Sequence, residues 1–125
     1  MMSSTVLKNN VGSVGIAGVG NMGRLMVECL KKNNYKVFCY DPSPKAQEFA
    51  QEKGAHVVLN PKELAQNAKL IIMSLPAPKQ VFDVIKGENG LIESLSSEHV
   101  VVDTSTVSPQ TSQEGARLVA HKGTR

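Results

Sequence analysis

The stretch from Val14 to Gly23 reads Val-Gly-Ile-Ala-Gly-Val-Gly-Asn-Met-Gly and decides the fold of this chain. Its first four residues are a short apolar run typical of a buried strand, and the glycines after it predict the end of that strand. Residues 18 to 23 match the pattern G-x-G-x-x-G. Apolar residues then recur at a spacing of three or four, which predicts one face of a helix. These apolar residues are Met22, Leu25, Met26, Cys29 and Leu30.

The remainder of the chain repeats this alternation of a short strand with a helix. Four further strands are expected, at 36–40, 56–59, 70–73 and 100–102. Helices are expected between them, and Asn60 followed by Pro61 and Glu63 predicts a capped helix start. Strands that are apolar on both faces and alternate with helices indicate an α/β protein with a parallel sheet. Right-handed crossovers then make that sheet doubly wound.

Length and composition restrict the class of protein. The chain of 125 residues suits one domain, predicted over residues 13–125, with residues 1–12 as a disordered tail. No stretch approaches the roughly 20 apolar residues of a membrane span, so no membrane partner is expected. A net charge of +3 with scattered basic residues and only 4% aromatic residues does not indicate a nucleic-acid partner.

The cysteines and the amino terminus give an expected compartment. Cys29 and Cys39 each fall within an apolar stretch, so we expect two buried thiols in a reducing compartment and no metal site. The first ten residues lack both the apolar core of a secretory signal and the repeated arginine of a mitochondrial presequence. The sequence therefore favours the cytoplasm, with the mitochondrion left open.

Ligands of such sheets bind at the carboxyl ends of the strands. There the glycine pattern is accompanied by an acidic residue, Asp41, at the end of the next strand. Gly18 would permit a tight turn, Gly20 would let a pyrophosphate approach bare main chain, and Gly23 would let the helix pack on the strand. Asp41 ends the next strand at the distance expected for an acidic residue that accepts hydrogen bonds from a ribose. We therefore predict a dinucleotide site. The alternatives are a structural turn for the glycines and a solvated turn residue for Asp41.

Asp41 also bears on the choice of cofactor. A carboxylate accepts hydrogen bonds from ribose hydroxyls and repels a 2′-phosphate, which favours NAD over NADP. Ser43 and Lys45 follow closely and could help to hold a phosphate, so NADP stays the less favoured alternative.

Several motifs in register resemble those of one enzyme family. They are Gly18 to Gly23 with Met26, Tyr40-Asp41, Leu75-Pro76, residues 87–91 (Gly-Glu-Asn-Gly-Leu), and residues 103–106 (Asp-Thr-Ser-Thr) followed by Pro109. From about Val14 onward the chain resembles the N-terminal half of 3-hydroxyisobutyrate dehydrogenase and related β-hydroxyacid dehydrogenases, and more distantly 6-phosphogluconate dehydrogenase. The resemblance implies a Rossmann-type domain that binds NAD, within an oxidoreductase acting on a small hydroxyacid.

The resemblance also implies roles for individual residues. The loop of Gly18, Val19, Gly20, Asn21, Met22 and Gly23 would bind the pyrophosphate, and Asp41 the adenosine ribose. Leu75 and Pro76 would line the cofactor path, and Gln80 would contact NAD, at a position where relatives commonly carry Asn. Thr106 would reach the nicotinamide and Ser105 would lie beside the substrate. From the residues alone, Ser105 and Thr106 indicate a turn capped by hydroxyls.

The catalytic group of the family is expected elsewhere. The resemblance places a proton-transferring lysine in a helical second domain, and no residue of this chain is predicted to be catalytic. We therefore expect little dehydrogenase activity from these residues alone. The last strand is expected to form an exposed apolar edge that a partner chain could cover. The alternative functions are a stand-alone nucleotide-binding module and, less favoured, a basic interaction protein.

Overall fold

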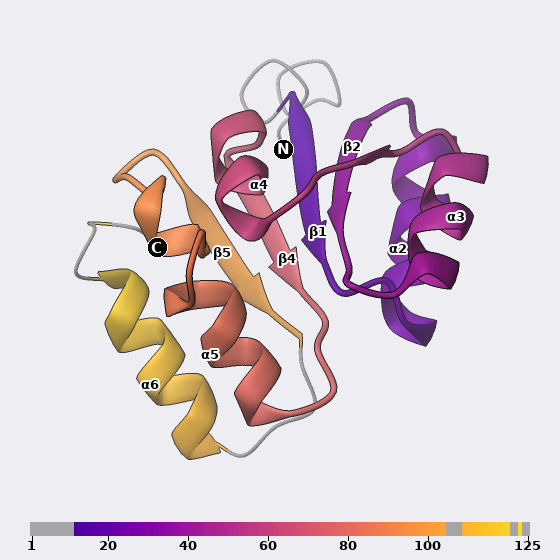
Figure 1. Ribbon diagram of the computed structural model, residues 1–125. Helices are drawn as coiled ribbons and strands as arrows, with labels where there is room; N and C mark the ends of the chain where they lie inside the picture. Colours follow the sequence, from indigo (N-terminus) through magenta and orange to yellow (C-terminus); the bar gives the residue numbers. More distant parts are fainter. Residues whose placement is uncertain (1–11, 105–108, 121–122, 124–125) are drawn as a thin grey trace.

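The computed structural model describes residues 12–104, 109–120 and 123. Within them a parallel sheet of five strands has the order β3-β2-β1-β4-β5 (Figure 1). The strands are β1 (Ser13–Ala17), β2 (Lys36–Tyr40), β3 (His56–Val57), β4 (Leu70–Met73) and β5 (Val100–Asp103). The order reverses beside β1, because the chain first moves outward through β2 and β3 and then returns to β4. This arrangement confirms the predicted doubly wound fold.

Helices cover both faces of the sheet (Figure 1). One face carries α2 (Asn21–Lys32) and α3 (Pro44–Glu52), which pack with β1 and β2 around Ile16 and Val37. The other face carries α4 (Pro61–Asn67), α5 (Pro78–Lys86), α6 (Pro109–Ala120) and the short 3-10 helix η1 (Leu91–Glu93). The predicted cap of α4 is confirmed, because the main-chain N–H of Glu63 donates to Oδ1 of Asn60 at 3.0 Å.

The third strand is shorter than predicted. The expected strand at 56–59 pairs with β2 only at His56 and Val57. Val58 still donates its N–H to the Cys39 carbonyl at 2.9 Å and buries its side chain, but Leu59 is 86% exposed. The apolar run therefore predicted too long a strand, because the chain already turns toward α4 at Leu59.

Only part of the apolar face predicted for α2 lies against the core: Met26 and Leu30 are partly buried and pack there, whereas the other residues of that face are exposed. Met22 is 56% and Leu25 is 63% exposed, and Cys29 is exposed as well, so the predicted burial of Cys29 is wrong. The residues buried against the sheet are Gly23 and Val27. A Cβ on Gly23 would lie 2.1 Å from the Gly18 carbonyl oxygen, so this close approach sets which side of the helix faces the sheet. Val27 follows four residues later on the same side.

The second cysteine is buried as predicted. Cys39 is 1% exposed in β2, and burial raises the pKa of its thiol to about 12, with the negative charge of Asp41 adding to the effect. The thiol therefore stays protonated at neutral pH and is a poor nucleophile.

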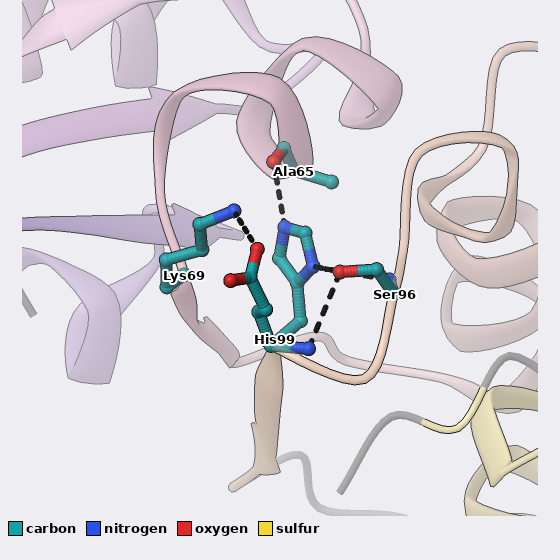
Figure 2. Close-up of polar contacts among 5 residues, drawn as sticks. Ala65, Lys69, Ser96 and His99 are labelled. Carbon is teal, nitrogen blue, oxygen red and sulfur yellow. Dashed lines mark hydrogen bonds and ion pairs between the residues drawn. The ribbon is translucent and has the colours of Figure 1, made fainter.

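His99 is buried directly before β5, and its ring contacts Ala65 and Ser96 (Figure 2). Nε2 of His99 lies 2.7 Å from the Ala65 carbonyl oxygen, which can only accept, so Nε2 carries the proton. Nδ1 then accepts from the main-chain N–H of Ser96 at 3.1 Å. Beside the ring, Lys69 pairs with Glu98 at 3.2 Å. These contacts connect the end of α4 to the start of β5, which is a structural role.

Strand β5 forms one edge of the sheet, and Val102 on it is 41% exposed. That a partner chain covers this edge stays a prediction.

Candidate functional site

A cleft of about 520 Å³ opens at the carboxyl end of the sheet. Residues that follow β1, β2, β4 and β5 line it, on both sides of the point where the strand order reverses. This is the position at which open α/β sheets bind ligands. The lining residues are Gly18, Gly20, Asn21, Met22, Asp41, Pro42, Ser74, Leu75, Pro76, Gln80 and Thr104.

Two of the loop glycines are required by close packing. Gly18 has φ of +99°, and a Cβ there would lie 2.2 Å from the Ser74 carbonyl oxygen. A Cβ built on Gly23 would likewise lie too close to the Gly18 carbonyl oxygen. Any side chain at either position would force the loop away from β4 or α2 away from the loop. The predicted turn at Gly18 and the predicted helix packing at Gly23 are both present.

The third glycine has a different reason to be there. A Cβ on Gly20 would meet nothing within 4 Å, so packing leaves this position free. Gly20 lines the cleft and precedes α2, whose start has no side-chain cap and no acidic residue in its first turn. The first N–H groups of a helix have no partner within the helix and carry a partial positive charge. Bare main chain and uncapped N–H groups at one point suit the diphosphate of a dinucleotide.

Asp41 stands at the opposite side of the glycine loop, at the end of β2. Its Oδ2 accepts from the main-chain N–H of Val19 and its Oδ1 from that of Ser43, both at 2.8 Å. Gln47 of α3 donates to the Asp41 carbonyl oxygen at 2.7 Å and holds the main chain of this residue. Each carboxylate oxygen keeps a second acceptor position, as two ribose hydroxyls require.

The far wall of the cleft comes from the ends of β4 and β5. Leu75 is 7% exposed and gives this wall an apolar surface, with Pro76 and Gln80 beside it at the start of α5. Thr104 donates both its N–H and its hydroxyl to the Met73 carbonyl oxygen, each at 2.8 Å, and so joins the end of β5 to β4.

The structure brings most predicted site residues to this cleft. Val19 does not line it, because its side chain is 1% exposed and its N–H is bonded to Asp41. Gly23 packs behind the loop, and Ser105 and Thr106 lie outside the described residues. Roles in binding for all of these residues stay predictions.

Sequence reasoning missed two lining residues, Pro42 and Ser74, whereas Thr104 belongs to the motif named above at residues 103–106. Ser74 directly follows β4, and Thr104 directly follows β5. The rule that ligands bind at carboxyl strand ends would have found Ser74 as well.

The fold and the cleft together define a dinucleotide-binding domain of the Rossmann type. Residues 13–125 match the family model described as the NAD binding domain of 6-phosphogluconate dehydrogenase. The chain belongs to this family, as the NAD-binding domain found in 3-hydroxyisobutyrate dehydrogenase-like oxidoreductases. The resemblance in the sequence motifs and the expectation of NAD as cofactor are thereby confirmed.

Individual relatives agree with this assignment. The chain is 34% identical over 110 residues to the mitochondrial 3-hydroxyisobutyrate dehydrogenase of Mus musculus, covering 88% of this chain and 33% of the mouse protein. A solved structure of 3-hydroxyisobutyrate dehydrogenase from Mycobacterium tuberculosis, with L-serine, superposes with a TM-score of 0.79 at 25% identity, over 90% of this chain and 38% of that one.

An imine reductase from Myxococcus stipitatus in complex with NAD+ has the same fold, with a TM-score of 0.81 at 14% identity over 90% of this chain and 38% of that one. The chain thus spans about a third of the length of the curated relatives it matches. No helix within the described residues is long and apolar enough to cross a membrane.

Proposed function

We propose that this chain supplies the cofactor site of a dehydrogenase that transfers hydride between NAD and a small β-hydroxyacid. The observation that carries the proposal is the cleft itself, where an open glycine main chain and the Asp41 carboxylate lie on the two sides of one loop. Names of the relatives, such as 3-hydroxyisobutyrate dehydrogenase, support the substrate class. When bound, NAD would supply the hydride acceptor, and the protein must supply its orientation and the proton transfer.

The residues of the cleft suit distinct parts of NAD. Gly18 and Gly20, with the start of α2, would hold the diphosphate, because no side chain separates it from the main-chain N–H groups. Asp41 would accept from the adenosine ribose through the free acceptor position on each oxygen. Leu75 would exclude water from one side of the cofactor path. In the resemblance, Thr106 would reach the nicotinamide and Ser105 the substrate.

Cofactor binding is tested by titrating the 125-residue chain with NADH and following cofactor fluorescence. Saturable binding is expected, and its absence would contradict the proposed site. Gly20→Ala serves as the matched variant and should bind NADH more weakly, since Gly20 lines the cleft and its added Cβ would meet no protein atom within 4 Å.

The preference for NAD over NADP is tested with Asp41→Ala. Loss of the carboxylate removes the ribose acceptor and the repulsion of a 2′-phosphate, so the ratio of NADH to NADPH affinity should fall about tenfold, or about 1.4 kcal/mol. An unchanged ratio would show that Asp41 does not discriminate between the cofactors.

Catalysis is tested separately, by following oxidation of 3-hydroxyisobutyrate with NAD. The resemblance assigns proton transfer to a lysine in a second, helical domain, so we expect no significant turnover by these residues alone. Turnover at the rate of ordinary dehydrogenases would require an acid or base within residues 1–125.

The compartment is proposed to be the cytoplasm, as the composition of the first ten residues favours. The named relatives include mitochondrial enzymes, so the competing location is the mitochondrion. Fractionation of cells that express the tagged chain separates the two.

A further inference from the structure

The carboxylate of Asp41 is bonded within the protein before any ligand arrives. Val19 and Ser43 each donate a main-chain N–H to a different oxygen of this carboxylate, at 2.8 Å. The bond from Ser43 closes a local turn two residues on, as Asp commonly does. The bond from Val19 spans 22 positions of sequence and joins the end of β2 to the glycine loop.

The glycine loop has few other attachments to β2. Gly18 donates its N–H to the Tyr40 carbonyl oxygen at 2.9 Å, which is a main-chain contact that any residue at position 40 could make. The Val19 side chain is buried in the cluster between the sheet and α2. Among these attachments, only the bond from Val19 N–H depends on the chemistry of the side chain at position 41. Gly20, the next residue, is the exposed main chain proposed to receive the diphosphate.

We propose that Asp41 is a positioning residue for the glycine loop, in addition to being a ribose acceptor. By holding the N–H of Val19, its carboxylate sets where Gly20 and the start of α2 stand. The position that binds the diphosphate and the position that binds the ribose therefore both depend on the Asp41 carboxylate. This inference rests on the proposed cofactor site and adds to it a dependence of diphosphate binding on Asp41.

Charge alone predicts the opposite effect. A carboxylate close to a diphosphate repels it, so removal of the negative charge would strengthen binding of the diphosphate if the loop kept its place. Loss of the Val19 bond would weaken that binding, because the N–H groups of the loop would no longer be held in position. The sign of the change therefore separates the two roles.

The experiment pairs Asp41→Ala with an NADH analogue whose adenosine ribose lacks both hydroxyl groups. If Asp41 only binds the ribose, the unmodified chain and the variant should bind this analogue equally, or the variant more tightly. The proposal predicts at least fivefold weaker binding of the analogue by Asp41→Ala. Equal or tighter binding by the variant would overturn it.

Two further variants complete the design. Asp41→Asn keeps one acceptor oxygen and should recover part of the affinity for the analogue, since one of the two N–H bonds can still form. Asn60→Ala is the matched control, because it also removes a side-chain oxygen that accepts a main-chain N–H, but at the start of α4 and away from the cleft. It should leave the affinity within twofold.

Amide hydrogen exchange of the ligand-free chain keeps the test independent of cofactor binding. The amides of Gly18 and Arg24, which donate to the carbonyl oxygens of Tyr40 and Gly20 at 2.9 and 2.8 Å and not to Asp41, should exchange at least threefold faster in Asp41→Ala and at an intermediate rate in Asp41→Asn. Unchanged exchange at these two amides would overturn the positioning role even if neither ligand bound. Failure of the unmodified chain to bind NADH, with faster exchange in the variant, would instead count against the proposed function alone.

Discussion

Helices α2, α3, α4 and α5 begin at the carboxyl end of the sheet, and their starts differ in one respect. Ser43 caps α3 by accepting from the Ala46 N–H at 3.5 Å, and Asn60 caps α4 by accepting from the Glu63 N–H at 3.0 Å. Helices α2 and α5, which follow Gly20 and Ala77, have no side-chain cap.

The two uncapped starts are also the two that border the cleft. Gly20, Asn21 and Met22 line it from α2, and Gln80 lines it from α5, whereas Ser43 and Asn60 do not contribute to the lining. The first N–H groups of a helix need a partner from a side chain, from water or from a ligand. Among α2 to α5, the two starts away from the cleft are capped by side chains of this chain, and the two starts that border the cleft are left open.

The largest effect should come from filling the cap position of α2. In Gly20→Asp the new carboxylate would accept from the first turn of α2 and place a negative charge at the proposed diphosphate seat. NADH affinity should fall roughly a thousandfold, about 4 kcal/mol, while stability changes little. NADH titration and urea unfolding measure the two quantities. An NADH affinity of Gly20→Asp close to that of the unmodified chain would contradict the inference that uncapped helix starts bind the cofactor.

A smaller loss, this time of stability, is expected for Gly18→Ala. Its Cβ would lie 2.2 Å from the Ser74 carbonyl oxygen at a φ of +99°, so the loop must move. We expect a cost of about 3 kcal/mol in the free energy of unfolding, against less than about 1 kcal/mol for Gly20→Ala, where the Cβ meets nothing. Urea unfolding of both variants checks the difference, and equal costs would contradict the separate roles given to these glycines.

Removal of a cap that faces no cofactor should affect stability alone. Asn60→Ala leaves the Glu63 N–H without its side-chain acceptor and should cost about 1 kcal/mol of folding free energy. NADH affinity should stay the same, because Asn60 does not line the cleft. A fall in affinity equal to that of a cleft variant would show that capping and cofactor binding are not separable in this fold.

The smallest effect is expected where a cap is added to α5. Ala77→Ser would supply an acceptor to the first turn of α5 and should raise stability by about 0.5 kcal/mol. If the start of α5 contacts the cofactor, NADH affinity should fall a few-fold at the same time. Unchanged affinity would show that, of the two uncapped starts, only that of α2 contacts the cofactor.

The sequence predicted much of this site, and its errors have physical causes. The glycine loop and Asp41 were found because their chemistry is local: a turn, a helix start and a strand end can be recognised from neighbouring residues. The burial of Met22, Leu25 and Cys29 was overestimated, because apolar spacing gives the period of a helix and not its rotation. Gly23 decides that rotation through its contact with Gly18.

The alternation of strands and helices, the turn at the three loop glycines and the acidic residue at the end of β2 could all be predicted from the sequence. Each of these depends on residues close together in the chain. Two features required the tertiary structure: the bond between the Asp41 carboxylate and the Val19 N–H, and the packing of Gly18 against the Ser74 carbonyl oxygen. These contacts join residues far apart in sequence, so they exist only once the strands have paired in the order that places β1 between β2 and β4.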